Sequence, residues 1–240
     1  MRFLGEMLSE AFNQIGSGNA ELLATTWRTL ELALISTAIA LLVGLPLGLL
    51  LGERATRWPR RGLVLANAGL GIPPVALGIY VAFLLLPGWP LGGLRWTYTL
   101  PALIIAQTLL AFPLVVALTA SAVRGLPAGL LDQARAFGAS WWHRGVFALR
   151  EARVGVLTAI IAALGSAVAE VGAVVIVGGN VRGRTNTLAS TILLDISASN
   201  PAGATADLIV LVALVLVLGG ILTFVQQRER GRHRLAVART

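Results

Sequence analysis

The chain contains no cysteine and no lysine, and only 12% of its 240 residues are charged. Without cysteine, a disulfide framework, a cysteine-based metal site and thiol chemistry are all excluded. Without lysine, the phosphate-binding loop G-x-x-x-x-G-K-[ST] is excluded as well. Any ATP chemistry that the function requires through such a loop must therefore belong to a partner.

Polar residues are scarce in the sequence. Hydrophobic residues make up 56% of the sequence, and the mean hydropathy is +0.81. A soluble globule of this length needs more polar surface than that to cover itself. The composition therefore indicates a membrane protein. The net charge of +8 could suggest nucleic acid, but a membrane protein carries a basic excess in its cytoplasmic loops, so we expect no nucleic-acid partner.

Five apolar stretches are each long enough to cross roughly 30 Å of hydrocarbon, which takes about 20 residues. They cover residues 30–51, 63–86, 100–123, 154–177 and 207–225. The sequence therefore predicts an all-α membrane protein with about five transmembrane helices.

The chain is expected to have three parts. Apolar residues between Phe3 and Ile15 recur at helical spacing, which predicts an amphipathic helix on the membrane surface. We assign residues 1–22 to this interfacial helix, 23–227 to the transmembrane domain and 228–240 to a basic tail.

The arginines predict the orientation, because positively charged loops remain in the cytoplasm. Four lie after the first apolar stretch, five in residues 124–153 and five in the tail, which makes fourteen of nineteen. This distribution, with an odd number of spans, predicts an outer N-terminus and a cytoplasmic C-terminus.

Residues 124–153 form a long polar interruption between apolar stretches. A short helix is expected to start near Pro127 and to stop at Gly138. On it, Leu131, Ala134 and Gly138 share one narrow face of mostly small residues. Such a face suits insertion into a groove on a partner. The alternative is an ordinary amphipathic connector between two membrane helices.

Prolines mark two apolar stretches. Pro73 and Pro74 are expected to interrupt the second stretch, and Pro113 the third, because proline removes a backbone donor. These interruptions indicate either a gate or pore lining, or a plain packing kink.

Glu170 lies inside the fourth apolar stretch. A carboxylate at that depth costs at least about 2.5 to 3.5 kcal/mol, so it should face protein or water and have a function. Three states are open: a protonated carboxyl, a pair with Arg182 or Arg184, or a hydrogen bond to backbone donors at a helix break.

A glycine-rich polar run follows at residues 177–187. Its glycines permit sharp turns, and its arginine, asparagine and threonine side chains supply donors that could receive a tetrahedral oxyanion. The alternative is an ordinary polar outer loop that contacts a periplasmic partner. The candidate residues are Gly178, Gly179, Asn180, Arg182, Arg184 and Thr185. Residues 188–196 are too short and polar for another full span and could form a re-entrant segment.

The polar interruption also carries a family motif. Asp132-Gln133-Ala134 followed by Gly138 is similar to the E-A-A-x-x-x-G signature of permease subunits of ATP-binding-cassette (ABC) importers. Asp132 replaces the usual Glu and Gln133 the first Ala, whereas the family's later Pro is Arg150 here.

Further stretches resemble the permeases of molybdate, tungstate and sulfate importers. They are residues 170–173, 178–185 and 188–192. Within that group, Val-Gly-Gly-Asn at 177–180, Gly-Leu-Gly-Ile-Pro-Pro-Val at 69–75 and Ile-Ile-Ala-Gln-Thr at 104–108 most resemble the tungstate-uptake permeases.

The resemblance implies a type I ABC importer permease that translocates an oxyanion, most closely tungstate, with molybdate or sulfate as alternatives. It implies a homodimer in the lipid bilayer, a pair of ATPase subunits that bind ATP and Mg, and a periplasmic or lipid-anchored binding protein; the permease itself carries no cofactor. The residues implied for coupling to the ATPase are Asp132, Gln133, Ala134, Arg135 and Gly138. Those implied for the path or gate are Pro73, Pro74, Glu170, Gly178, Gly179, Asn180, Arg182, Arg184 and Thr185.

Two other classes of protein remain as rivals. An ion-coupled secondary transporter would suit broken helices and a buried acid, but it does not explain the docking helix. An intramembrane hydrolase would need a nucleophile and a base, or paired carboxylates, at one depth. Glu170 has no evident acidic companion in a neighbouring span, so we expect no enzyme.

Overall fold

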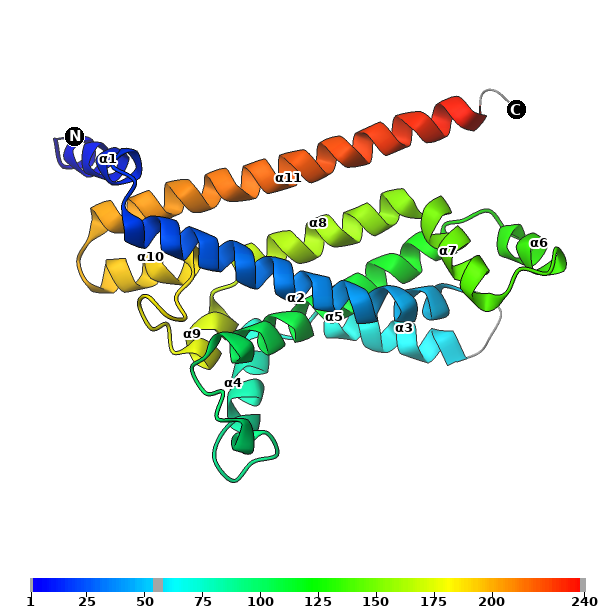
Figure 1. The fold of residues 1–240 in the computed structure, drawn as a ribbon, viewed down its shortest axis with the longest axis horizontal. Helices are drawn as coiled ribbons and strands as arrows, with labels where there is room; N and C mark the ends of the chain where they lie inside the picture. Colours follow the sequence, from blue (N-terminus) through cyan, green and yellow to red (C-terminus); the bar gives the residue numbers. More distant parts are fainter. Residues whose placement is uncertain (1, 54–57, 238–240) are drawn as a thin grey trace. The chain divides into compact units, whose positions relative to one another are not determined.

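The computed structural model describes residues 2–53 and 58–237, and all regular structure in them is helical (Figure 1). The helices are α1 (Arg2–Gly16), α2 (Ala20–Gly52), α3 (Trp58–Gly69), α4 (Pro74–Leu84), the 3-10 helix η1 (Gly92–Leu94), α5 (Leu100–Arg124), α6 (Leu130–Ala136), α7 (Trp141–Glu151), α8 (Arg153–Ala169), α9 (Gly172–Gly178), α10 (Leu188–Ser197) and α11 (Pro201–Val237).

Among the described residues, three helices are long and apolar enough to cross a membrane: α2, α5 and the Pro201–Arg228 part of α11. The count rises to five if the pairs α3–α4 and α7–α8 are each taken as one bent span. The prediction of about five spans in an all-α membrane protein is confirmed.

Two spans begin earlier than hydropathy alone predicted, because capping residues extend the helices. In α2, the Asn19 side chain accepts a hydrogen bond of 2.9 Å from the backbone N–H of Glu21. In α11, the Asn200 side chain accepts one of 3.1 Å from Gly203, and Pro201 occupies the first turn. Both arrangements satisfy backbone donors that a helix start leaves free.

The expected interruption at Pro73 and Pro74 is present, because α3 ends at Gly69 and α4 begins at Pro74. The expected interruption at Pro113 is wrong. This proline lies inside the continuous helix α5, where a membrane helix tolerates the lost backbone bond if neighbouring groups pack closely. Gly69 gives that space, since a Cβ atom built there would lie 2.7 Å from the Cβ of Pro113.

The fourth apolar stretch is also broken. Helix α8 ends at Ala169 and α9 begins at Gly172, so Glu170 lies in the gap. At its other end α8 follows α7 with a bend of 76°.

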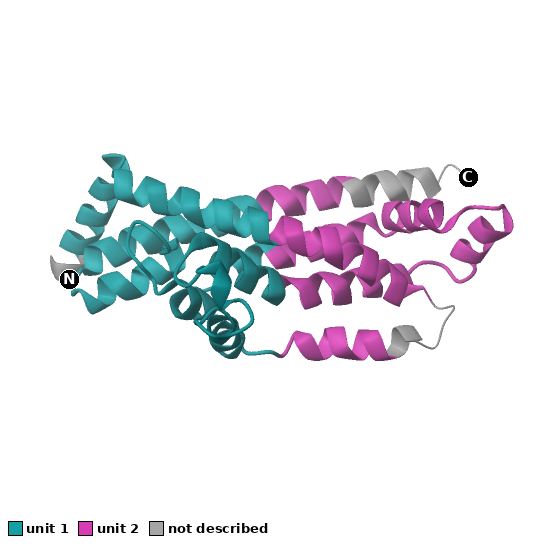
Figure 2. Cartoon of the chain, turned by 60° about the horizontal axis from the view of Figure 1, so that its bottom comes forward, with its two compact units in different colours: residues 1–36, 72–110, 164–218 teal, residues 37–71, 111–163, 219–240 magenta. Residues whose placement is uncertain are grey.

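The chain divides into two compact units, shown in teal and magenta in Figure 2. Unit 1 comprises residues 1–36, 72–110 and 164–218, and unit 2 comprises 37–71, 111–163 and 219–240. A core of unit 1 includes Leu32, Val81, Leu85, Leu103 and Val174. Unit 2 has smaller cores that include Leu49, Val115, Val116, Val123 and Ala148.

Glycines let α2 approach α5 closely within unit 2. A Cβ atom built at Gly44 would lie 2.8 Å from Val115, and one at Gly48 would lie 2.6 Å from the Cβ of Thr119. Small residues at such positions allow membrane helices to pack backbone against backbone.

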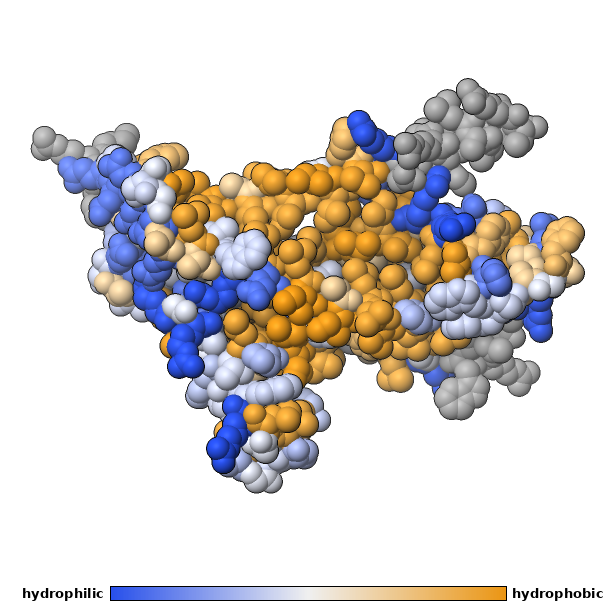
Figure 3. All heavy atoms as spheres, in the orientation of Figure 1, coloured by the Kyte–Doolittle hydropathy of each residue, from blue (hydrophilic) through white to orange (hydrophobic). Residues whose placement is uncertain are grey.

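Apolar side chains dominate much of the surface that Figure 3 shows. On α11 the exposed large hydrophobic residues are Leu208, Val212, Val215, Leu216, Val217, Ile221, Phe224 and Val225. In water such an exposed apolar surface would promote aggregation. In the hydrocarbon of a membrane it is favourable, which agrees with a lipid-facing helix.

Candidate functional site

The segment predicted to couple to the ATPase, residues 124–153, contains the short helix α6. Its N-cap is Gly129, whose φ of 83° is left-handed, so the helix starts three residues after the expected Pro127. Its end is at the predicted place. Gly138 has a φ of 81°, its N–H bonds to the carbonyl of Arg135, and that of Ala139 bonds to the carbonyl of Ala134. This is a Schellman ending, which explains the glycine.

The face of α6 that we expected to enter a partner points partly into the permease itself. Leu131 packs against the unit 2 core of Leu49, Val123 and Ala148. A narrow apolar face on a short helix is stabilised by the nearest apolar core, and the sequence could not show that this core belongs to the same chain.

The outward face of α6 carries polar side chains and one aromatic ring. Asp132, Gln133 and Arg135 are exposed, and the side chain of Phe137 is 91% exposed. An aromatic side chain as exposed as this one is a candidate anchor for a partner surface. The sequence analysis did not single out Phe137, although it directly precedes the helix-ending Gly138.

A pocket of about 220 Å³ lies beside α6, and its lining includes Leu131, Asp132 and Arg135. Across it Arg144 of α7 forms a 3.5 Å ion pair with Glu53 at the end of α2. This pair links the predicted coupling segment to the end of α2 within unit 2.

The break between α8 and α9 is held by side chains on both sides. Glu170 accepts a hydrogen bond of 3.0 Å from the backbone N–H of Ala173, in the first turn of α9. The Nε2 of Gln107, on α5, donates a bond of 3.2 Å to the carbonyl of Ala167 in the last turn of α8. Ser36 in turn donates to Oε1 of Gln107 at 3.2 Å. Of the three states open for Glu170, the structure has the bond to a backbone donor.

The starts of α4 and α9 are neighbours. A Cβ atom built at Gly172 would lie 2.8 Å from Cγ2 and 3.6 Å from the backbone nitrogen of Val75. Pro73 and Pro74 therefore lie close to the α8–α9 break in unit 1, and the structure brings these path candidates together with Glu170.

Most of the glycine-rich run, residues 178–187, is a tightly bonded loop that follows α9. Gly179, Asn180 and Gly183 all have positive φ angles. The Thr185 hydroxyl donates to the carbonyl of Gly178 at 2.6 Å and accepts from the N–H of Val181 at 2.9 Å. Both Asn180 and Thr185 are buried, so their side chains fix the loop rather than face solvent.

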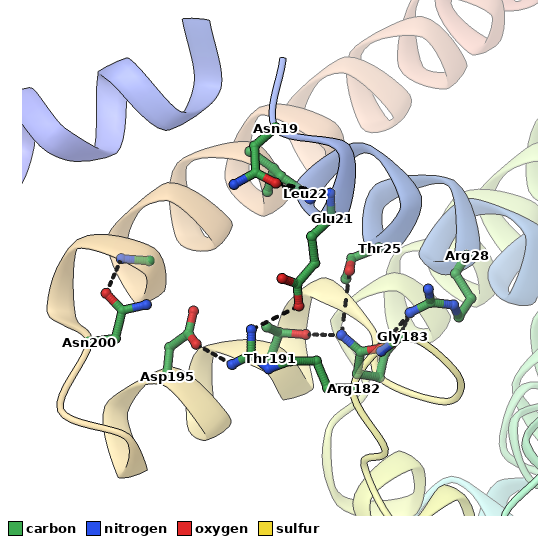
Figure 4. A network of polar contacts seen from close by, with 12 residues as sticks. Asn19, Glu21, Leu22, Thr25, Arg28, Arg182, Gly183, Thr191, Asp195 and Asn200 are labelled. Carbon is green, nitrogen blue, oxygen red and sulfur yellow. Dashed lines mark hydrogen bonds and ion pairs between the residues drawn. The ribbon is translucent and has the colours of Figure 1, made fainter. Parts of the chain in front are cut away.

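Arg182 binds two carboxylates, as Figure 4 shows. One guanidinium nitrogen donates to Glu21 of α2 at 2.8 Å and the other donates to Asp195 of α10. The hydrogen bonds with Asp195 and then with Glu21 raise the pKa of Arg182 above its usual value. Its fork is therefore occupied, whereas the exposed side chain of Arg184 makes no hydrogen bond or ion pair among the described residues.

Two residues that the sequence analysis did not single out anchor the loop to α2. Arg28 donates to the backbone carbonyl of Asn186 at 2.9 Å and also to its side-chain oxygen. The Asn186 amide in turn donates to Thr191 at 2.8 Å. An isolated arginine near the start of the first span was the available signal. Helix α10 then begins with a capping box between Thr187 and Ser190.

Residues 44–231 match the family described as "Binding-protein-dependent transport system inner membrane component". The chain belongs to this family. It is a multi-pass inner-membrane permease without catalytic activity of its own, and ATP hydrolysis takes place on a partner ATPase. The family description also implies a binding protein as a partner.

Curated relatives cover nearly the whole permease. A "Probable anion ABC transporter permease protein" of Haloferax volcanii is 33% identical over 217 residues, 88% of this chain and 94% of the relative. The "Tungstate uptake system permease protein TupB" of Peptoclostridium acidaminophilum is 28% identical over 227 residues, 95% of this chain and 100% of the relative. The resemblance to ABC importer permeases, drawn from the sequence, is confirmed.

A solved structure shares the fold of the permease. A chain of the inward-facing MetNI methionine ABC transporter has a TM-score of 0.69 and 22% identity, over 87% of this chain and 95% of that chain. The predicted ABC importer permease fold is confirmed. The rival assignments, an intramembrane hydrolase and an ion-coupled secondary transporter, do not fit this family.

Proposed function

We propose that this permease translocates a tetrahedral oxyanion, and that the oxyanion is tungstate. The observation that carries the proposal is the match to a tungstate uptake permease over its entire length. The relative described as an anion permease supports the same class of substrate. Molybdate and sulfate have the same shape and charge, and they are the alternatives.

The proposed complex contains two copies of the permease, two ATPase subunits and one binding protein. The arginine distribution places the N-terminus outside and the C-terminus in the cytoplasm. In this orientation α6 meets the ATPase, and the loop at residues 178–187 lies on the outer side, where the binding protein delivers the anion.

In the proposed cycle, ATP binding closes the ATPase pair and draws the two copies of α6 together, and hydrolysis resets them. The α8–α9 break is the proposed gate. At this break the start of α9 bears a positive partial charge, which compensates the Glu170 carboxylate through the bond to Ala173. A carboxylate held in this way repels a passing oxyanion less than a free one would.

The contacts of Arg182 and Arg184 distinguish these two candidates for the translocation path. Because Arg182 is occupied by Glu21 and Asp195, we assign it to loop structure. Arg184 is exposed and makes no hydrogen bond or ion pair with any described residue, so it is the better candidate for a first contact with the anion. Pro73, Pro74 and Glu170 remain candidates for the gate.

The test is the ATPase activity of the complex, reconstituted in liposomes with its ATPase and binding protein, on addition of tungstate, molybdate or sulfate. Tungstate is expected to stimulate at the lowest concentration. If molybdate or sulfate stimulates first, the substrate assignment is wrong although the importer mechanism stands. If no oxyanion stimulates, the proposal fails.

A variant of α6 tests the coupling role. Gly138→Trp is expected to keep basal ATP hydrolysis on the partner but to abolish oxyanion stimulation. Gly88→Trp is the matched control, because Gly88 also has a positive φ, of 85°, and no heavy atom within 4 Å of a built Cβ. Equal loss in both variants would indicate backbone strain and not coupling.

A further inference from the structure

A polar pocket of about 140 Å³ lies within unit 1, beside the Arg182 network of Figure 4. It is bounded by the start of α2, by α10 and by the first turns of α11. Its charged lining residues are Glu21, Arg182, Asp195 and Asp207. We call this site the acidic pocket, because its lining contains three carboxylates and one guanidinium.

Asp207 has no partner in this pocket. Asp207 is 5% exposed. Its carboxylate makes no hydrogen bond or ion pair within the described part of the chain. Arg182 forms ion pairs with Glu21 and Asp195 and none with Asp207. Asp195 is 4% exposed, so the pocket holds two buried carboxylates, of which Asp195 alone is paired with Arg182.

Buried charges in proteins are normally paired, because removal of a carboxylate from water is costly without a counter-charge. Such a carboxylate is either neutralised by protonation or paired with a cation, and a cation that enters this pocket would stabilise the ionised form of Asp207. A metal ion is a poor candidate, since the described residues include no group of three carboxylate, imidazole or thiol side chains placed to hold one. The guanidinium of Arg182 bridges Glu21 and Asp195, so a basic side chain is the kind of cation that the carboxylates of this pocket already bind.

We propose that the acidic pocket receives an arginine or lysine side chain of the binding protein when that protein docks on the permease. The inference rests on the proposed function, which places the starts of α2 and α11 on the outer side. The entering cation would pair with Asp207. The pocket volume of about 140 Å³ is several times the roughly 10–15 Å³ that one water molecule needs. The charged end of a basic side chain therefore has room in it.

The test measures the affinity of the binding protein for the permease–ATPase complex in nanodiscs. Asp207→Asn, which keeps the shape and removes the charge, is expected to raise the Kd at least tenfold. Glu10→Gln is the control, because Glu10 is an exposed carboxylate of α1 outside the pocket. Its Kd is expected to stay within twofold of wild type. An unchanged Kd for Asp207→Asn would overturn the inference.

A charge-reversal experiment distinguishes the loss of a specific ion pair from misfolding of the variant. Asp207→Arg should abolish docking, and a glutamate in place of one basic residue on the binding protein should restore it. Assembly of the variant with the ATPase on size exclusion confirms that it is folded. If no single reversal among the surface basic residues restores docking, the inference is wrong.

Two other outcomes are informative. Docking that is lost in EDTA and restored by calcium would overturn the inference in favour of a metal ion. If wild-type complex binds the binding protein but no oxyanion stimulates its ATPase, the proposed substrate class fails, while the docking result still decides the role of Asp207.

Discussion

Glu170 accepts a hydrogen bond of 3.0 Å from the backbone N–H of Ala173, across the gap between α8 and α9. A carboxylate in an apolar stretch is thus compensated by the start of the next helix and not by an arginine. The same arrangement satisfies a backbone donor that the break leaves free. Charge and helix break therefore stabilise each other.

This bond leads to a comparison of two variants of Glu170. Glu170→Gln retains an oxygen acceptor, so the free energy of unfolding should change little. Glu170→Leu removes the acceptor and should cost about 1 kcal/mol, as loss of a helix cap does. Thermal unfolding of the purified complex measures both. Equal stability of the two variants would mean that the bond to Ala173 contributes nothing.

Packing of α2 against α5 predicts a strong effect at Gly48. Gly48→Ala places a methyl group 2.6 Å from the Cβ of Thr119 and 3.0 Å from the carbonyl oxygen of Val116. Overpacking of this kind costs about 1 to 3 kcal/mol. Gly165→Ala is the control, since a Cβ there meets no heavy atom within 4 Å. A Gly48→Ala variant as stable as the control would show that α2 and α5 can separate freely.

The two arginines of the outer loop should behave differently. Arg182→Gln leaves the buried Asp195 without its charged donor, which should cost about 1 to 3 kcal/mol and speed hydrogen exchange in residues 180–187. Arg184→Gln breaks no bond in the described structure and should stay within about 0.5 kcal/mol of wild type. Hydrogen exchange read by mass spectrometry compares them. Faster exchange in Arg184→Gln alone would reverse the assignment of the two roles.

Phe137 should matter for association with the ATPase and not for folding. Its side chain is 91% exposed, so Phe137→Ala should change the free energy of unfolding by less than about 0.5 kcal/mol. Truncation of an aromatic anchor costs about 2 kcal/mol of binding, which is roughly a thirtyfold rise in Kd. Phe12→Ala, at an exposed aromatic residue of α1, serves as the control. Unaltered ATPase affinity in Phe137→Ala would exclude the anchor.

Local rules accounted for much of the architecture. The stop at Gly138 and the break at Pro73 and Pro74 follow from backbone chemistry within a few residues of each site. Pro113 shows where such a rule fails. The same missing donor that breaks one helix is accommodated in α5, where Gly69 makes room for the proline ring.

The sequence by itself determined that the chain crosses a membrane, roughly where it does so, and which segments carry the family motifs, because hydropathy and helix-ending signals are properties of short segments. Only the tertiary structure decided the partners of the charged and polar groups. Arg182 meets Glu21 across 161 positions, and Arg28 meets Asn186 across 158. Such pairs depend on distances in space between residues far apart in the chain, and no local pattern encodes those distances.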